Sequence, residues 1–149
     1  MAFWICGVMV FLLDRWTKFL VVQKMNMGET IPVIKDFLHI TYIKNPGAAF
    51  GILAEKTWFF IIVTIAILII IIYFNYTLGK DNVLFSIVFG LVAGGAVGNL
   101  FDRLQSGLVV DFIDFRVVWP YIFNLADAAI VVGMVLLAWQ ILMSEKLKD

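Results

Sequence analysis

The sequence predicts an all-α membrane protein with four transmembrane helices and a small surface β-sheet or loop element. The chain has 149 residues, of which 63% are hydrophobic and 15% are charged, whereas about a quarter of an ordinary soluble domain is charged. Residues 57–79 and 82–101 carry no charged side chain, and a span of the hydrocarbon core needs about 20 residues. A patterned polar segment, residues 23–56, precedes these two runs and supplies the sheet element.

Two further apolar runs complete the four spans. The run from Trp119 to Met143 is interrupted only by Asp127, and the run over residues 2–22 carries its charges in its second half. A secretory signal peptide is the alternative for residues 1–22, but no small-residue cleavage pattern follows them, so we interpret them as a helix. The chain, residues 1–149, is then a single integral membrane domain with spans at about 2–22, 57–78, 83–102 and 119–143.

Four spans place successive connections on opposite sides of the membrane. Segments 23–56 and 104–118 then lie on one side, and Lys80 and Asp81 lie with both termini on the other. Cytoplasmic loops carry an excess of lysine and arginine. The larger segment has one lysine more than the opposite side (Lys24, Lys35, Lys44 and Lys56 against Lys80, Lys146 and Lys148). The count alone therefore favours a cytoplasmic position for residues 23–56.

The stretch "IKDFLHITYIKNPGAAFG" in the first polar segment predicts a strand followed by a turn. Two sets of side chains alternate along it before it breaks at residues 45–47 (Phe37, His39, Thr41 and Ile43; Leu38, Ile40 and Tyr42). We therefore expect a small sheet on the membrane surface. His39, the only histidine, is expected to have a structural or exposed position rather than a catalytic one.

Small residues form a stripe along the third span, because they recur every four positions (Gly90, Gly94, Gly98). Such a stripe lets another helix approach closely, and we expect it to fix the third helix against the fourth. The same step continues to Asp102, and a neighbouring stripe from Gly95 ends in Asn99 and Arg103. These two stripes therefore place three polar side chains at the end of the bundle that adjoins residues 23–56.

Two aspartates are the leading candidates for chemistry. Asn124 and Asp127 are three residues apart and share a helix face; if the fourth helix begins near Pro120, Asp127 lies about 10 Å below its start. An ionisable group at that depth is costly and marks a functional site. Asp111, in the adjoining loop, can fold back onto the same region. The structural alternative is a carboxylate held by Arg103 or by a buried hydrogen-bond network.

Two carboxylates in a low dielectric tend to share one proton. The ionised member can take a proton from water while the protonated member donates to a scissile carbonyl, which hydrolyses a peptide bond without a metal. Other catalytic sets are poorly supplied: the chain has one histidine and one cysteine, Cys6, with no HExxH, GxSG or GxGD motif. A net charge of zero gives no basic footprint for nucleic acid.

Four ordered motifs carry a resemblance to a known family: "NPGAAFG" (45–51), "GGAVGNLFDR" (94–103), "VVDF" (109–112) and "FNLADAAI" (123–130). In this order, between four apolar segments, they resemble bacterial lipoprotein signal peptidase, signal peptidase II. The resemblance implies an intramembrane aspartyl endopeptidase that removes the signal peptide from diacylglyceryl-modified prolipoproteins by cleaving before the lipidated cysteine. It implies Asp111 and Asp127 as the catalytic pair.

The same resemblance implies a shell of residues that support the reaction or bind substrate (Asp14, Asn45, Gly47, Asn99, Asp102, Arg103 and Asn124). The asparagine amides can orient carbonyls or the aspartates themselves. Arg103 can pair with Asp102 or neutralise charge near the dyad. A structural alternative stays open for each: Asp14 lies four residues before Lys18, so an ion pair on a helix surface also explains it.

The resemblance also implies a multi-pass protein of the bacterial cytoplasmic (inner) membrane. Both termini are then cytoplasmic, and the active site and sheet element are extracytoplasmic, against the lysine count. No cofactor or metal is expected; the partners are a prolipoprotein substrate with a lipidated cysteine and membrane lipid, with no nucleic acid, and the chain is expected to be a monomer. Two rivals remain: a proton-coupled transporter or channel that uses the aspartates as a relay, and a noncatalytic membrane scaffold.

Overall fold

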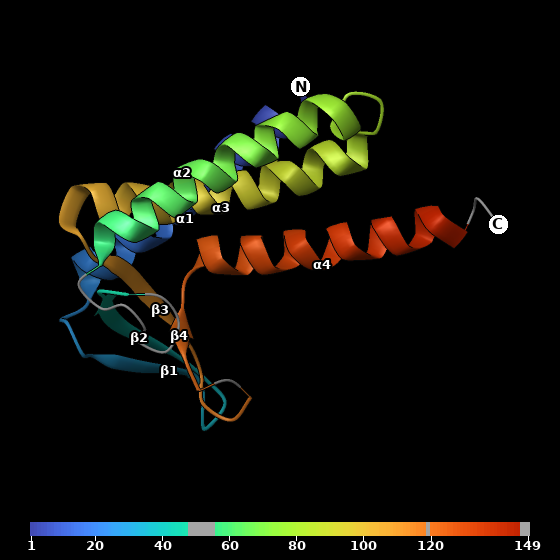
Figure 1. Cartoon of the computed structure of the whole chain (residues 1–149). Coiled ribbons are helices and arrows are strands. Elements are labelled where there is room, and N and C mark those ends of the chain that lie inside the picture. Colours follow the sequence, from blue (N-terminus) through green and yellow to red (C-terminus); the bar gives the residue numbers. More distant parts are fainter. Residues whose placement is uncertain (48–55, 119, 147–149) are drawn as a thin grey trace.

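The computed structural model describes residues 1–47, 56–118 and 120–146. Its elements follow one another along the chain in this order (Figure 1): α1 (Ala2–Lys24), β1 (Thr30–Ile34), β2 (Leu38–Asn45), α2 (Thr57–Phe74), the short π-helix η2 (Asn75–Gly79), α3 (Val83–Ser106), β3 (Val109–Phe115), β4 (Ile122–Phe123) and α4 (Leu125–Lys146). The prediction of a mostly helical protein with a small sheet is confirmed. The sheet lies at one end of the helices, and both termini lie at the other end (Figure 1).

Three helical stretches of the described chain are long and apolar enough to cross a membrane: Thr57–Gly79, Val83–Ser106 and Leu125–Met143. α1 has a comparable length of 23 residues, and it carries the charges of Asp14, Arg15 and Lys18 in its second half. The fourth predicted span, residues 2–22, therefore forms a helix of the right length whose charges need internal partners.

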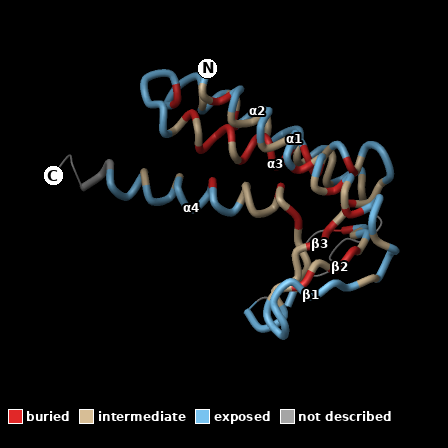
Figure 2. The backbone as a smooth tube through the Cα atoms, turned by 180° about the vertical axis from the view of Figure 1, so that it is seen from behind, coloured by how far each residue is buried: buried red, intermediate tan, exposed pale blue. Residues whose placement is uncertain are grey.

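α3 is the centre of the helical layer. Within the three spans, 61% of the α3 window is buried, against 6% for α2 and 11% for α4, and Figure 2 shows the buried positions gathered along α3. The outer faces of α1, α2 and α4 expose large apolar side chains such as Trp16, Ile69 and Val135. Lipid tails are as apolar as these side chains, so the exposed faces suit a hydrocarbon environment.

Glycines set the distance between α3 and two of its neighbours. A Cβ on Gly94 would lie 2.5 Å from the carbonyl oxygen of Gly7 in α1, and one on Gly90 would lie 2.7 Å from the carbonyl oxygen of Phe3. A Cβ on Gly95 would collide with the carbonyl oxygen of Ala126 in α4. The expectation that the Gly90 stripe fixes α3 against α4 is therefore wrong: that stripe packs on α1, and Gly95 serves α4.

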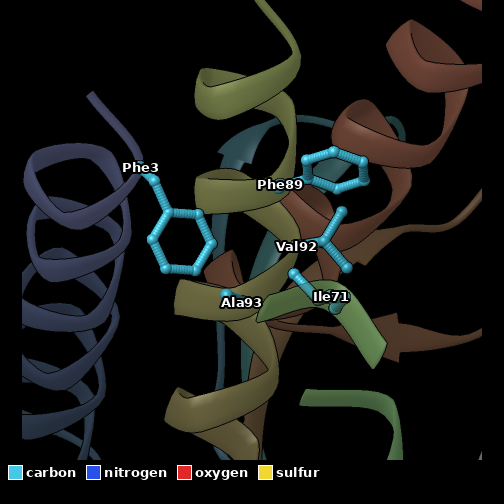
Figure 3. Packing of buried hydrophobic residues seen from close by; sticks show 5 residues of the cluster. All are labelled: Phe3, Ile71, Phe89, Val92 and Ala93. Atoms are coloured by element: carbon cyan, nitrogen blue, oxygen red, sulfur yellow. The ribbon is translucent and has the colours of Figure 1, made fainter. Parts of the chain in front are cut away.

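Apolar packing completes the fold at two levels. Phe3 of α1 and Ile71 of α2 form one cluster with Phe89, Val92 and Ala93 of α3 (Figure 3). Inside a bilayer such contacts gain little from leaving water, so close packing and dispersion hold the helices together.

A second cluster joins the end of α1 to the sheet. It consists of Val21, Tyr42 and Phe112, from α1, β2 and β3. This cluster fixes the sheet against the helices, and with it the position of the strand that carries Asp111.

The sheet is antiparallel with strand order β1-β2-β3-β4. The predicted strand is confirmed as β2, where His39 is 6% exposed and therefore internal. Asp111, expected in a loop, lies instead within β3 and pairs with Ile43 of β2. Strand pairing holds the Asp111 backbone in place, which a loop would not do.

The fourth helix begins later than expected. Ile122 and Phe123 pair with β3 as the strand β4, and α4 starts at Leu125, not near Pro120; Trp119, the expected start of the span, lies outside the described residues. Asp127 therefore lies in the first turn of α4 rather than about 10 Å below its start.

Candidate active site

Asp111 is held in β3 by two asparagine amides. Its carboxylate accepts hydrogen bonds from Asn45 Nδ2 at 3.0 Å and from Asn124 Nδ2 at 2.7 Å, and the residue is only 2% exposed. Burial raises the pKa of Asp111 to about 6, with a further upward contribution from the negative charge of Asp127 and a partial offset from the two amide hydrogen bonds. This carboxyl therefore binds a proton more readily than an ordinary aspartate.

Asp127 is half-buried and takes part in the N-terminal cap of α4. Its backbone N–H donates to Asn124 Oδ1 at 3.0 Å, and its carboxylate accepts from the backbone N–H of Asn124 at 3.2 Å. Such a reciprocal pair satisfies two amide groups at a helix start, and a carboxylate there is favoured by the helix dipole. The other oxygen, Oδ1, accepts from Asn99 Nδ2 at 2.7 Å.

The two aspartates meet through one residue. Asn124 is fully buried, donates its side-chain amide to Asp111 and its backbone N–H to Asp127, and so holds both carboxyls within its own reach. Both aspartates line the same cleft, which has a volume of about 1260 Å³ and lies between the sheet and the ends of α3 and α4. The sequence prediction that Asp111 folds back onto the region of Asp127 is confirmed.

The other predicted shell residues on the cleft are Asn45, Gly47, Asn99 and Arg103. Asn45 Oδ1 accepts the backbone N–H of Gly47 at 3.0 Å, which sets the turn and leaves the Asn45 amide nitrogen for Asp111. Arg103 donates to the carbonyl of Gly47 at 3.4 Å and lies 5.1 Å from the ring centre of Phe60. Residues 48–51 of the "NPGAAFG" motif lie outside the described residues.

The remaining two predicted residues, Asp14 and Asp102, do not line this cleft. Asp14 is fully buried, forms an ion pair with Lys18 at 2.9 Å, and accepts the backbone N–H of Ala126 at 3.1 Å. Asp102 pairs with Lys18 at 2.8 Å and with Arg15. Among the described residues no ion pair joins Arg103 to Asp102; Arg103 instead lines the cleft with both aspartates, which agrees with the other expected role, neutralising charge near the dyad.

The residue that sequence reasoning undervalued is Lys18. It is 1% exposed, and besides both carboxylates it contacts Asn99 Oδ1 at 3.0 Å. The sequence contained a signal for this role, because a lysine inside an apolar span needs a buried partner. The third span offered more than one polar side chain that could be that partner.

The walls of the cleft are mostly apolar. They are formed by side chains of the sheet, of the β4 approach and of α4 (Phe37, Ile43, Val109, Phe115, Val118, Pro120, Tyr121, Ile122, Phe123, Ala128, Val131, Val132). Within the described ranges, no three His, Cys, Asp or Glu side chains gather as a metal site. The polar side chains that line the cleft are two carboxyls, two asparagine amides, the Arg103 guanidinium, the Lys44 ammonium and the Tyr121 hydroxyl.

Known proteins resemble this chain over nearly its whole length. The family model described as Signal peptidase (SPase) II matches residues 6–143. The lipoprotein signal peptidase of Desulfitobacterium hafniense (strain DSM 10664 / DCB-2) is 45% identical over 146 residues, which cover 98% of this chain and 96% of the relative. The lipoprotein signal peptidase of Pelotomaculum thermopropionicum is 49% identical over 144 residues, which cover 95% of this chain and 92% of the relative.

Solved structures share the fold. A bacterial membrane enzyme determined by the in meso method at 2.3 Å matches with a TM-score of 0.92 and 37% identity, over 97% of this chain and 90% of that one. A second such structure, at 1.9 Å, matches with a TM-score of 0.86 and 38% identity, over 93% of this chain and 90% of that one. These matches confirm the resemblance that the four motifs indicated, and the chain belongs to the signal peptidase II family.

Proposed function

We propose that this membrane peptidase is an aspartic endopeptidase that acts on diacylglyceryl-modified prolipoproteins and cleaves the peptide bond before the lipidated cysteine. The relatives are lipoprotein signal peptidases, which gives the substrate class. One observation supports the aspartic mechanism above all: Asn124 holds the carboxyls of Asp111 and Asp127 together at the wall of one cleft.

In the proposed reaction the pair begins with one proton, held by Asp111, because burial raises the pKa of that carboxyl to about 6. Asp127 takes a proton from a water molecule as the water oxygen attacks the scissile carbonyl carbon, and Asp111 gives its proton to the carbonyl oxygen. The tetrahedral intermediate then collapses: the C–N bond breaks, the leaving nitrogen receives the proton from Asp127, and a hydroxyl proton returns to Asp111. No metal or cofactor takes part.

The supporting residues receive roles from their contacts. Asn45, Asn99 and Asn124 hold the two carboxyls, while Arg103 and the Gly47 turn lie on the cleft wall, where they can bind backbone carbonyls and N–H groups of the substrate. Asp14 and Asp102 have structural roles in this proposal, since their carboxylates are paired with cations away from the cleft.

The proposed topology has four spans, with α1 as the fourth. Its charged Asp14 and Lys18 are at most 1% exposed, so the face that α1 turns to lipid remains apolar. The sheet and cleft then lie on the extracytoplasmic side of the bacterial inner membrane, with both termini in the cytoplasm, as their positions at opposite ends of the helices permit (Figure 1). We propose that the single domain, residues 1–149, acts as a monomer in contact with membrane lipid and binds no nucleic acid.

The proton-coupled transporter is the weaker candidate. A relay across a membrane needs ionisable groups along the whole path, whereas Asp14, Asp102 and Asp127 join a single group of hydrogen bonds and ion pairs with Lys18 and Asn99. The comparisons give it no support.

The test is cleavage of a purified diacylglyceryl-modified prolipoprotein by the purified protein in a lipid bilayer mimetic with chelator present. We expect a product that begins at the lipidated cysteine, identified by mass spectrometry, and none with Asp127→Asn. Proteoliposomes made from the same protein are expected to show no proton flux. Flux without cleavage would support the transporter, and neither activity would support the scaffold.

A further inference from the structure

We propose that Lys18 is a positioning residue for the reaction: through its ammonium group it orients the Asn99 amide so that Asn99 donates to Asp127, which then enters the reaction as the base. This inference rests on the proposed function, because it assigns a role within the same aspartate pair. Lys18 does not touch the cleft, so its effect on the chemistry passes through Asn99.

The Lys18 ammonium has three polar neighbours, two carboxylates in ion pairs and one asparagine to which it donates a hydrogen bond. They are Asp102 Oδ2 at 2.8 Å, Asp14 Oδ2 at 2.9 Å and Asn99 Oδ1 at 3.0 Å. Lysine can only donate, whereas an asparagine amide has an oxygen that accepts and a nitrogen that donates. The oxygen of Asn99 must therefore face Lys18, and the nitrogen is directed at Asp127, to whose Oδ1 it donates at 2.7 Å.

The second amide near Asp127 is oriented independently, by the start of α4. Asn124 Oδ1 accepts the backbone N–H of Asp127, so its Nδ2 is free to donate to Asp111 Oδ1 and to Asn99 Oδ1 at 3.1 Å. Asn99 Oδ1 thus receives two donors, from Lys18 and from Asn124. If Lys18 were absent, only one of these would remain to keep the amide from turning its oxygen toward Asp127.

Stability alone does not account for this lysine. A buried ion pair is often no more stabilising than apolar side chains of the same volume, and Asp102 already has Arg15 as a partner. An apolar replacement could reproduce neither the pair with Asp14 nor the contact with Asn99, and the contact with Asn99 is the one that leads to the reacting carboxyl.

The charges around Asp111 and Asp127 also balance when these two residues share one proton. The groups that surround Asn99 come from four elements (Asp14, Arg15 and Lys18 on α1; Asp102 and Arg103 on α3; Asp111 on β3; Asp127 on α4). Arg15 and Lys18 offset the charges of Asp14 and Asp102. Arg103 offsets the single negative charge that Asp111 and Asp127 carry when they share one proton. Loss of the Lys18 charge leaves this end of the bundle one charge more negative, which makes a second proton on the pair more favourable.

The test uses two variants, since a buried carboxylate left unpaired can unfold the protein. Lys18→Met removes the ammonium alone. Lys18→Met with Asp14→Asn removes the Lys18–Asp14 pair as a unit, keeps an oxygen for the Ala126 N–H, and leaves Asp102 with Arg15. Lys24→Met is the control, because Lys24 is an exposed lysine on the same helix. Activity is measured on a diacylglyceryl-modified prolipoprotein, with thermal unfolding in the same detergent.

We expect kcat to fall about 100-fold in both variants, which is the scale of a misplaced catalytic group, with KM unchanged in both and the folded fraction unchanged in the double variant. The acid limb of the kcat profile moves to higher pH in Lys18→Met and stays in place in the double variant, which loses one charge of each sign. Lys24→Met behaves as the unaltered protein. A loss of kcat that only follows a loss of folded protein, or an unshifted pH profile of Lys18→Met, would overturn the inference.

A double-mutant cycle with Asn99→Ala gives the sharpest result. If Lys18 acts through Asn99, removal of the ammonium in the Asn99→Ala background lowers kcat by less than about threefold further. A further loss near 100-fold would mean that the two residues act separately, and the inference fails while the proposed function stands. Absence of cleavage by the unaltered protein would instead remove the proposed function itself.

Discussion

Two groups of buried carboxylates lie side by side at the sheet end of the helices, and they differ in their partners. Asp14 and Asp102 form what we call the paired cluster with the cations Arg15 and Lys18. A second group, the amide cluster, consists of Asp111 and Asp127 with three asparagines (Asn45, Asn99, Asn124). Asp14, Asp102 and Asp111 are each 4% exposed or less, so burial does not distinguish Asp111 from the carboxylates of the paired cluster.

The partner decides what each carboxylate can do. The cations Arg15 and Lys18 hold Asp14 and Asp102 in ion pairs, and the pairs on Asp102 join α1 to α3. Asp111 has two amide donors as its hydrogen-bond partners, and burial raises its pKa to about 6. The amide cluster can therefore hold a proton and give it up, which an acid–base reaction requires.

The largest expected effect is on activity in the amide cluster. Asp111→Asn keeps the shape of the side chain but removes the exchangeable proton, so kcat should fall about 10⁴-fold or more, a loss of about 5.5 kcal/mol in transition-state stabilisation. The unfolding temperature should stay close to that of the unaltered protein. Asp81→Asn, in the exposed turn before α3, is the matched control. Cleavage at even a tenth of the normal rate by Asp111→Asn would place the reaction elsewhere.

The next effect is on stability in the paired cluster. Asp14→Ala leaves Lys18 with one carboxylate fewer and removes the acceptor of the Ala126 N–H, so the free energy of unfolding should fall by about 3–5 kcal/mol. Thermal unfolding in detergent measures it. Asp14→Asn, which keeps the oxygen for Ala126, should lose less. The distinction between the two clusters would be wrong if the Asp14→Ala protein kept its normal unfolding temperature but no longer cleaved substrate.

A third prediction concerns pH. The pKa of Asp111 is raised to about 6, and a carboxyl with a raised pKa keeps its proton below that value and loses it as the pH increases through it. Since Asp111 must be protonated to act as the acid, kcat/KM should fall about tenfold per pH unit above 6. The corresponding decrease in kcat should begin at a higher pH than the decrease in kcat/KM, because bound substrate excludes water from the cleft. If kcat/KM rises between pH 6 and 8, Asp111 is the base and the two roles are reversed.

The smallest effect is expected at an exposed ion pair outside both clusters. Arg116 is 48% exposed and contacts Asp114 at 3.3 Å. Such a pair contributes at most about 1 kcal/mol, so Arg116→Ala should leave unfolding and cleavage nearly unchanged at moderate salt. A loss comparable to that of Asp14→Ala would show that exposure does not separate important from unimportant ion pairs in this protein.

Much of the fold could be predicted because its signals are local. Long apolar runs predicted the helices, and the alternation around His39 predicted β2. The start of α4 could not be read from hydropathy, since Ile122 and Phe123 are apolar whether they form a helix or pair with β3. The partner of the glycine stripe could not be predicted either. Its spacing predicted a close helix contact, but the spacing did not indicate that α1 makes this contact.

The candidate site divides in the same way. Asp127 stood out because a carboxylate beside an apolar run is costly, and Asn124 because it precedes that residue by three positions. Lys18 and Arg15 were visible as charges, yet their pairing with Asp102 was not, and Arg103 seemed the nearer partner by sequence. Which side chains share a carboxylate depends on the contact between α1 and α3.

By itself the sequence determined that this is a helical membrane protein with costly carboxylates at one end, because hydrophobicity and the 3.6-residue repeat act over neighbouring residues. Only the tertiary structure decided which carboxylates meet cations and which meet amides. The contacts that separate the two clusters join residues far apart in the chain, such as Asp14 with Ala126, Lys18 with Asn99 and Asn45 with Asp111. Such distances are closed by helix packing and strand pairing, which no local pattern specifies.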